Sequence, residues 1–192
     1  MKEQPIVTAI TPTTSQHLQF NSAVLLWRFQ FGVDWKPEDV IGATRGGLTF
    51  RAVPQYHNVE ADGVPTNYKG LQRLDEWDVG AECTMLEFKP DTIELGLGAG
   101  VKKTSESGYT KFTVTHNIDE ENDYKDIWIV GSLSNGGKAV VQIKNGLNKS
   151  GLTLSTADKG EGTFSLNITG HYDYEGLKDG VAPFAIYYPT ED

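Results

Sequence analysis

Cysteine is almost absent from this sequence, and histidine is sparse. The single cysteine, Cys83, excludes an internal disulfide, and this scarcity fits a protein that stays in a reducing compartment. The four histidines lie far apart, without the paired spacing or the cysteine partners that zinc sites use: His17, His57, His116 and His171. We therefore expect no metal site, and we expect Cys83 to be a small core residue rather than a nucleophile.

Long apolar runs are also missing. The longest apolar patch, residues 23–27, is far shorter than the ~20 residues that a membrane-spanning helix needs. The first five residues lack the charged and then apolar build of a secretory signal. These observations predict that the protein has no membrane anchor and that it folds in the cytoplasm.

Positive charge is in deficit. The chain of 192 residues has 17 Lys and Arg against 26 Asp and Glu, which gives a net charge of −9 at pH 7. This balance argues against a protein built to hold nucleic acid through its phosphates. It is compatible with a surface that DNA passes without binding.

No catalytic motif is present, and the nearest approximations fail on spacing. The glycines at positions 96, 98 and 100 follow a predicted helix instead of opening one, so they present no helix N-terminus to a phosphate. The acidic segment 120–126 lacks the central glycine of a calcium-binding EF-hand loop, and a solvated turn is the better interpretation. Asp75 and Glu76 are adjacent, and neighbouring strand residues point to opposite faces. We expect no enzyme and no cofactor.

Glycines are abundant, and they separate short apolar runs. The segment 135–137 (Asn-Gly-Gly) lies between the apolar runs 127–130 and 139–143, which predicts a β-hairpin, and the pair Asn145-Gly146 is expected to end the second run. Strict alternation predicts half-buried strands in three further segments, with inward faces formed by these residues: Leu48 and Phe50; Val79, Ala81, Cys83 and Met85; Phe164, Leu166 and Ile168.

These patterns predict a mainly β protein. Pro90, followed by acidic residues in the first turn, predicts one short helix that the glycines near residue 98 end. Short strands with one flanking helix favour an antiparallel β-sandwich or a partly closed barrel. We expect an N-terminal arm at residues 1–20, rich in Thr, Gln and Pro, and a single domain at residues 21–192.

The order of several short segments adds a family resemblance. Residues 42–51, 60–63, 69–71, 73–76, 86–88 and 183–189 follow one another as they do in the major tail tube proteins of long-tailed bacteriophages and related phage-tail-like particles, which this chain resembles. The resemblance implies a tail-tube-like β-sandwich with one short flanking helix. It also implies hexameric rings that stack into a hollow tube, with a continuous barrel lining the lumen through which DNA passes.

The resemblance further implies a place and partners. The protein would be a structural virion protein, assembled in the bacterial host cytoplasm, and its main partner would be itself. Tape measure proteins and tail terminator or tip proteins would be the others. The N-terminal arm and the segment between Val53 and Lys69, expected to be a loop, would carry contacts between rings.

Two sets of residues follow from this hypothesis. Polar side chains on the non-core faces of the alternating strands are the candidates for the lumen: Thr49, Arg51, Glu82, Thr84, Ser165, Asn167 and Thr169. Candidates for contacts between subunits or rings lie mostly in the segment that follows residue 53: Arg45, Tyr56, His57, Glu60, Asp62, Lys69, Arg73, Asp75 and Glu76.

An alternative hypothesis is a monomeric β-sandwich that binds a ligand such as a carbohydrate. Such modules stack sugars on exposed aromatic rings, and the chain has candidates for this role. They are Trp27, Trp35, Trp77, Tyr187 and Tyr188. Clustered and solvent-facing rings, together with the absence of self-association, would favour this alternative.

Overall fold

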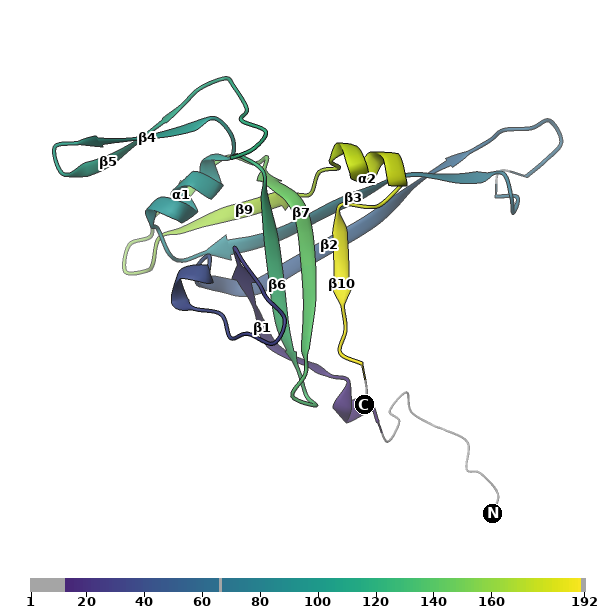
Figure 1. Ribbon diagram of the computed structural model, residues 1–192, viewed down its shortest axis with the longest axis horizontal. Helices are drawn as coiled ribbons and strands as arrows, with labels where there is room; N and C mark the ends of the chain where they lie inside the picture. The colour runs from purple at the N-terminus through teal and green to yellow at the C-terminus, as the bar shows by residue number, and fades with distance from the viewer. Residues whose placement is uncertain (1–12, 66, 191–192) are drawn as a thin grey trace, which may run out of the picture.

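The computed structural model describes residues 13–65 and 67–190, which form ten strands, two α-helices and two 3-10 helices (Figure 1). In chain order, the elements are η1 (Thr14–Gln16), β1 (Gln19–Leu26), η2 (Pro37–Asp39), β2 (Thr44–Asn58), β3 (Gln72–Met85), α1 (Pro90–Leu97), β4 (Val101–Glu106), β5 (Tyr109–Val114), β6 (Lys125–Leu133), β7 (Lys138–Asn148), β8 (Leu154–Ser155), β9 (Thr163–Thr169), α2 (Tyr174–Asp179) and β10 (Phe184–Tyr187).

The architecture is a mainly β, antiparallel sandwich, one of the two arrangements predicted, and it does not close into a barrel. Eight strands form one continuous sheet in the order β1-β6-β7-β9-β3-β2, with β10 beside β7 and β8 beside β9. The strand β7 connects the two layers, because it pairs with β6 and β10 along its first part and with β9 at Leu147 and Asn148. The β4–β5 hairpin, residues 101–114, forms a separate small sheet.

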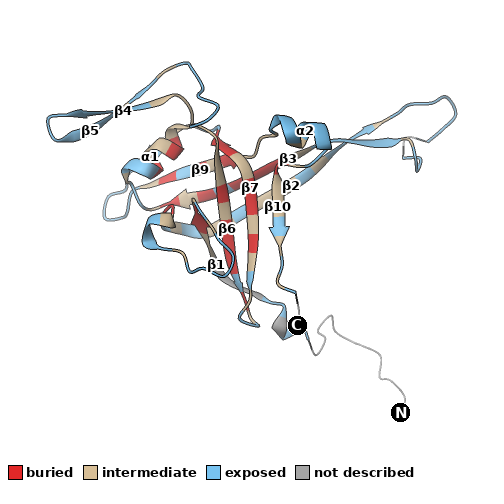
Figure 2. Ribbon diagram, viewed as in Figure 1, coloured by how far each residue is buried: buried red, intermediate tan, exposed pale blue. Residues whose placement is uncertain are grey.

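The core lies between the two layers, where Figure 2 shows buried residues on β3, β6, β7 and β9. All three predicted inward faces pack into this core. The residues from β3 and β9 are fully or nearly fully buried, and they meet Leu25, Ile127 and Ile143 from the other layer. Burial raises the pKa of the Cys83 thiol to about 11, which keeps it protonated at neutral pH.

The predicted hairpin and helix both form. Asn135 and Gly136 make the turn between β6 and β7, where Gly136 has a φ of 86° and the Asn135 side chain accepts a hydrogen bond from the Gly137 amide at 2.9 Å. Helix α1 begins at Pro90 and is held by Thr92, whose buried hydroxyl accepts from the Lys89 amide at 3.0 Å. The second helix, α2, was not predicted; Asp173 caps its first turn.

The expected end of β7 at Asn145-Gly146 was wrong, because the strand continues to Asn148. Asn145 has a φ of 49°, and the pairing between β6 and β7 shifts at this point. A Cβ on Gly146 would lie 2.9 Å from Ile168 and 3.0 Å from the Lys125 carbonyl oxygen. The pair therefore forms an irregularity within β7, close to where the strand passes from one layer to the other, and not a turn.

The segment expected to be a loop between Val53 and Lys69 is partly strand. Strand β2 continues to Asn58 and β3 begins at Gln72, so the two strands project from the sandwich as a long hairpin. We call residues 55–76 the distal β2–β3 hairpin. Figure 1 shows it at one end of the longest axis, with the β4–β5 hairpin at the opposite end.

The expected N-terminal arm lies mostly outside the described residues, which begin at Thr13. The boundary at residue 20 falls inside β1, because Gln19 and Phe20 already pair with Leu133 and Ser132 of β6.

Candidate functional site: a polar sheet face and two projecting hairpins

The seven candidate lumen residues lie together on one face of the sheet formed by β2, β3 and β9. Residues that pair across antiparallel strands share a face, and the pairings place the candidates in three rows. The rows are Thr49–Glu82–Asn167, Arg45–Thr84–Ser165 and Arg51–Gly80–Thr169. This face is the one opposite the core, so the alternation correctly separated the two sides of all three strands.

The polar face is slightly concave. A shallow hollow of about 490 Å³ lies over its centre, and Thr49, Glu82, Ser165 and Asn167 are among the side chains that line it. Hydroxyl, amide and carboxylate groups thus dominate the hollow, with no aromatic ring among its lining residues.

The positive charges on this face are compensated. The Arg51 guanidinium lies 3.4 Å from the Asp78 carboxylate, and Arg45 forms a hydrogen-bonded ion pair with Glu161. The pKa of Glu161 is lowered first by a hydrogen bond from its own backbone amide and then by Arg45. With Glu82 also present, three carboxylates face two guanidinium groups, so the surface offers no excess positive charge to a polyanion.

Gly80 is a residue of this face that sequence reasoning missed. A Cβ at this position would lie 3.2 Å from Arg51 Nε and 2.9 Å from the Ile168 carbonyl oxygen. The missing side chain lets the Arg51 side chain lie across β3 toward Asp78. The signal in the sequence was a glycine at a non-core position of an alternating strand.

The candidates for contacts between subunits separate into two places. Arg45 belongs to the polar face, whereas the other eight lie on the distal β2–β3 hairpin or on the loop at its tip. All nine are exposed. Among the described residues, no charged side chain between Glu60 and Glu76 has an ion-pair partner, in contrast to Arg45 and Arg51.

The distal hairpin continues the core face of the sheet into solvent. Pro54 pairs with Trp77 over the edge of the core, and the next pair on the same side is Tyr56 with Leu74. Asp75 is an extra residue in β3 at this point, and this bulge keeps Leu74 opposite Tyr56. Tyr56 is 61% exposed and Leu74 is 49% exposed. Sequence reasoning missed Leu74, because it treated Asp75 as a regular strand residue.

Strand β2 forms an edge of the sheet. It has 15 residues and pairs only with β3 among the described strands. Long free edges invite pairing with another chain. This edge carries Pro54 and two glycines, Gly46 and Gly47, at an irregularity of the register, which are features that limit uncontrolled pairing.

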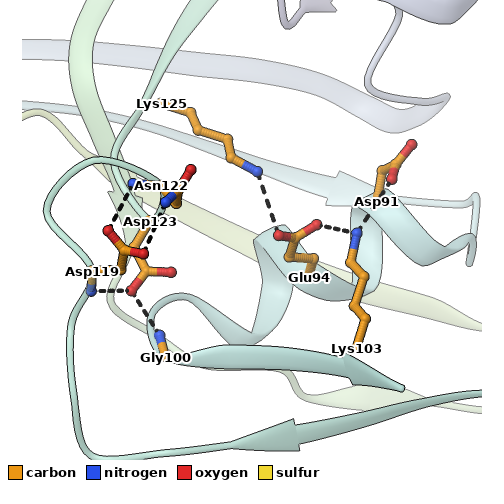
Figure 3. Close-up of polar contacts among 8 residues, drawn as sticks. All are labelled: Asp91, Glu94, Gly100, Lys103, Asp119, Asn122, Asp123 and Lys125. Carbon is orange, nitrogen blue, oxygen red and sulfur yellow. Dashed lines mark hydrogen bonds and ion pairs between the residues drawn. The ribbon is translucent and has the colours of Figure 1, made fainter. Parts of the chain in front are cut away.

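An ion-pair network fixes the base of the β4–β5 hairpin (Figure 3). Glu94 on α1 lies 2.5 Å from Lys103 Nζ on β4 and 3.5 Å from Lys125 Nζ on β6. Burial acts to raise the pKa of Glu94, but the two ammonium groups outweigh it and hold that pKa below its usual range.

The acidic segment forms a turn at residues 120–123, whereas Lys125 and Asp126 already begin β6. The Asp123 carboxylate accepts from the amides of Gly100 and Asp119, both at 2.8 Å, as Figure 3 shows. The Asn122 side chain is the main cause that lowers the pKa of Asp119. In the part of the chain that the structure describes, no group of three or more His, Cys, Asp or Glu side chains could hold a metal ion.

The five aromatic residues of the alternative hypothesis do not all lie together, although Trp27 and Trp35 line one hollow of about 780 Å³ with Phe29 and Trp128. Trp27 contacts the core and Lys125, Trp35 lies under the Lys138 ammonium at 4.5 Å, and Trp77 packs against Phe184. Tyr187 and Tyr188 follow each other near the end of β10. Tyr187 stacks on Trp128 and donates a hydrogen bond to Gln142, while Tyr188 is half exposed.

Comparison with known proteins adds no assignment to this geometry. No protein-family model matches the sequence, and no curated protein matches it at a significant level. Among the described residues, no helix has the length and apolar character needed to cross a membrane.

Proposed function

We propose that this protein is a structural virion protein that assembles into stacked rings, and that these rings form a phage tail tube through which DNA passes. The observation that carries the proposal is the polar face of β2, β3 and β9, on which every candidate lumen residue lies and where positive charge is compensated. The ordered sequence segments that resemble tail tube proteins support the same function.

The free edge of β2 supports ring closure. Such an edge in a monomer is a site of uncontrolled association, whereas pairing between neighbouring copies in a closed ring removes it. The ring would then carry a continuous sheet, with the polar face on the inside and the core face of each copy covered by its own β6, β7 and β10.

The charge balance supports passage of DNA without binding. A duplex has one negative charge per about 1.7 Å of its axis, so a basic wall would hold it through counterion release. A wall of hydroxyls, amides and paired charges with a slight acidic excess does not. The net charge of −9 acts in the same direction.

The proposed location is the virion, with assembly in the bacterial host cytoplasm. The tape measure protein and the tail terminator or tip proteins are proposed partners on the basis of the family resemblance alone. Contacts between rings are assigned to the distal β2–β3 hairpin and to the N-terminal arm.

The first prediction tests both assembly and the lumen face. Negative-stain microscopy at rising protein concentration should reveal rings and then tubes. A Glu82→Lys, Ser165→Lys variant should also form tubes, because exposed substitutions cost within about 0.5 kcal/mol of folding stability. Its tubes should retain duplex DNA in a nuclease-resistant and salt-dependent form, whereas unmodified tubes should not.

A matched control places the same charge change elsewhere. Glu120 and Thr156 are exposed and lie outside the polar face, so Glu120→Lys, Thr156→Lys tubes should leave bound DNA open to nuclease. Equal protection by both variants would show that the polar face does not line the lumen. A protein that stays monomeric at every concentration would refute the assembly itself and favour the monomeric binding module.

A further inference from the structure

The two projecting hairpins differ in charge as well as in position. The β4–β5 hairpin has Lys102, Lys103 and Lys111 against Glu106, a net charge of +2 in a chain of −9. The distal β2–β3 hairpin has Glu60, Asp62, Asp75 and Glu76 against Lys69 and Arg73, a net charge of −2. Figure 1 places these oppositely charged hairpins at opposite ends of the molecule.

One face of the β4–β5 hairpin is used within the chain. Lys103 lies on the same face as Phe112 and Val101, and it binds Glu94 of α1. These two apolar residues are half buried. This face is therefore turned toward α1.

The other face of the β4–β5 hairpin is directed away from α1. The register places Lys102, Lys111 and Tyr109 on this face. Tyr109 is 78% exposed, Lys102 has no ion-pair partner among the described residues, and Lys111 pairs only with Glu106 of the same hairpin. The face thus combines an aromatic ring with two ammonium groups and one carboxylate, that of Glu106, which pairs with Lys111.

The distal β2–β3 hairpin offers the complementary surface. The exposed pair of Tyr56 and Leu74 continues the core face beyond the point at which β10 and the opposite layer cover it. The carboxylate of Asp75 lies beside Leu74 at the bulge, whereas Glu76 pairs with Gln55 on the opposite face of the hairpin. An apolar pair flanked by an unpaired carboxylate complements a ring flanked by lysines in both polarity and charge.

We propose that the distal β2–β3 hairpin of one copy docks on the outward face of the β4–β5 hairpin of the next copy. Tyr56 and Leu74 cover Tyr109, and Asp75 faces Lys102 and Lys111. This inference rests on the proposed self-assembly and specifies its receiving surface. Because the two surfaces lie at opposite ends of one molecule, the contact is head-to-tail, and each copy keeps one surface of each kind to propagate the assembly.

Charge reversal tests the pairing. A Lys102→Glu, Lys111→Glu variant and an Asp75→Lys variant should each need at least about tenfold more protein for half-maximal assembly, because like charges then meet at the contact. An equimolar mixture should assemble as well as the unmodified protein, since each altered hairpin finds an oppositely charged partner. Sedimentation velocity measures the assembled fraction.

A matched control reverses two lysines elsewhere. Lys149 and Lys159 are exposed and have no ion-pair partner among the described residues, so Lys149→Glu, Lys159→Glu should leave the assembly concentration within about twofold of its original value. Thermal unfolding of each variant monitors the fold. Failure of the mixture to recover assembly, with all variants folded, would overturn the docking.

Cysteine cross-linking tests the proposed docking independently of the proposed tube. Oxidation of mixed Leu74→Cys and Tyr109→Cys proteins should give a 74–109 disulfide, identified by mass spectrometry; the buried Cys83 should not compete. Tubes that yield only 74–74 or no cross-links would refute the docking and leave the proposed function standing. A 74–109 link in short oligomers that never form tubes would support the docking and refute the tube. A protein that stays monomeric would refute both.

Discussion

The same two strands behave differently in two regions of this molecule. Within the sandwich, β3 buries one complete face, and Val79 is 0% exposed. Five residues earlier in the same strand, Leu74 is 49% exposed, although it also belongs to the core face. The difference lies in the opposite layer, which covers Val79 and ends before Leu74. Alternation along a strand therefore identifies a face that could be buried, and only the tertiary arrangement decides whether it is.

The largest expected effect comes from comparing these two regions directly. Leu166→Ala in the core should lower the free energy of unfolding by about 2–5 kcal/mol, through lost burial and a residual cavity. Leu74→Ala should change it by less than about 0.5 kcal/mol in the monomer, because the side chain is largely in solvent. Urea denaturation under non-assembling conditions measures both values. A large loss for Leu74→Ala would mean that the distal hairpin is covered within the chain itself.

A second comparison contrasts two glycines near the β4–β5 hairpin. Gly100 at its base and Gly108 in its turn both have positive φ, 71° and 82°. A Cβ at Gly100 would lie 2.5 Å from the Thr115 carbonyl oxygen, whereas nothing lies within 4 Å at Gly108. Gly108→Ala should therefore lower the free energy of unfolding by only the cost of holding alanine at a positive φ, about 1–2 kcal/mol. Gly100→Ala should lower it by more, because the new Cβ also collides with the backbone.

The same denaturation measurement decides between the two variants. Amide hydrogen exchange along the hairpin adds a local readout, because Gly100→Ala should loosen its base and Gly108→Ala only its turn. Equal losses would indicate that the backbone near Thr115 moves away at little cost.

The sandwich could be predicted from sequence because its determinants are local. Period-two alternation identified the inward faces of β3 and β9, and Asn135-Gly136 identified a hairpin turn that requires positive φ. Pro90 identified the start of α1 in the same way. Each of these signals depends on a few neighbouring residues, and the packing of the two layers reinforces it.

The features of the fold that could not be predicted depend on contacts between residues distant in the chain. Asn145-Gly146 has the composition of a turn, yet β7 continues past this irregularity because Gly146 pairs with β6 and the two following residues pair with β9. The bulge at Asp75 shifts the register and places Leu74 beside Tyr56, which alternation alone could not anticipate. Alternation could predict that the candidate lumen residues lie on the face opposite the core. It could not predict the role of Gly80, because that role depends on the Arg51 side chain of the neighbouring strand, which lies across the glycine.

The smallest expected effect concerns the ion pairs that join the β4–β5 hairpin to the sandwich. Glu94 has a pKa below its ordinary value of about 4.5, so its charged form stabilises the fold above that pH. This contribution should disappear as the pH falls through the lowered pKa. Glu94→Gln should remove about 1 kcal/mol or less at neutral pH, because the ion pairs are partly exposed to solvent.

Amide hydrogen exchange can detect this small loss of stability locally, in the β4–β5 hairpin. Glu94→Gln should increase the exchange of the β4 and β5 amides at neutral pH and leave the amides of β3 and β9 unchanged. As the pH falls through the lowered pKa of Glu94, the difference in exchange between the variant and the original protein should shrink. Glu120→Gln removes an exposed carboxylate without an ion-pair partner among the described residues and should have no such effect. Equal exchange in all three proteins at neutral pH would mean that packing against α1, through Phe112 and Val101, holds the hairpin without the ion pairs.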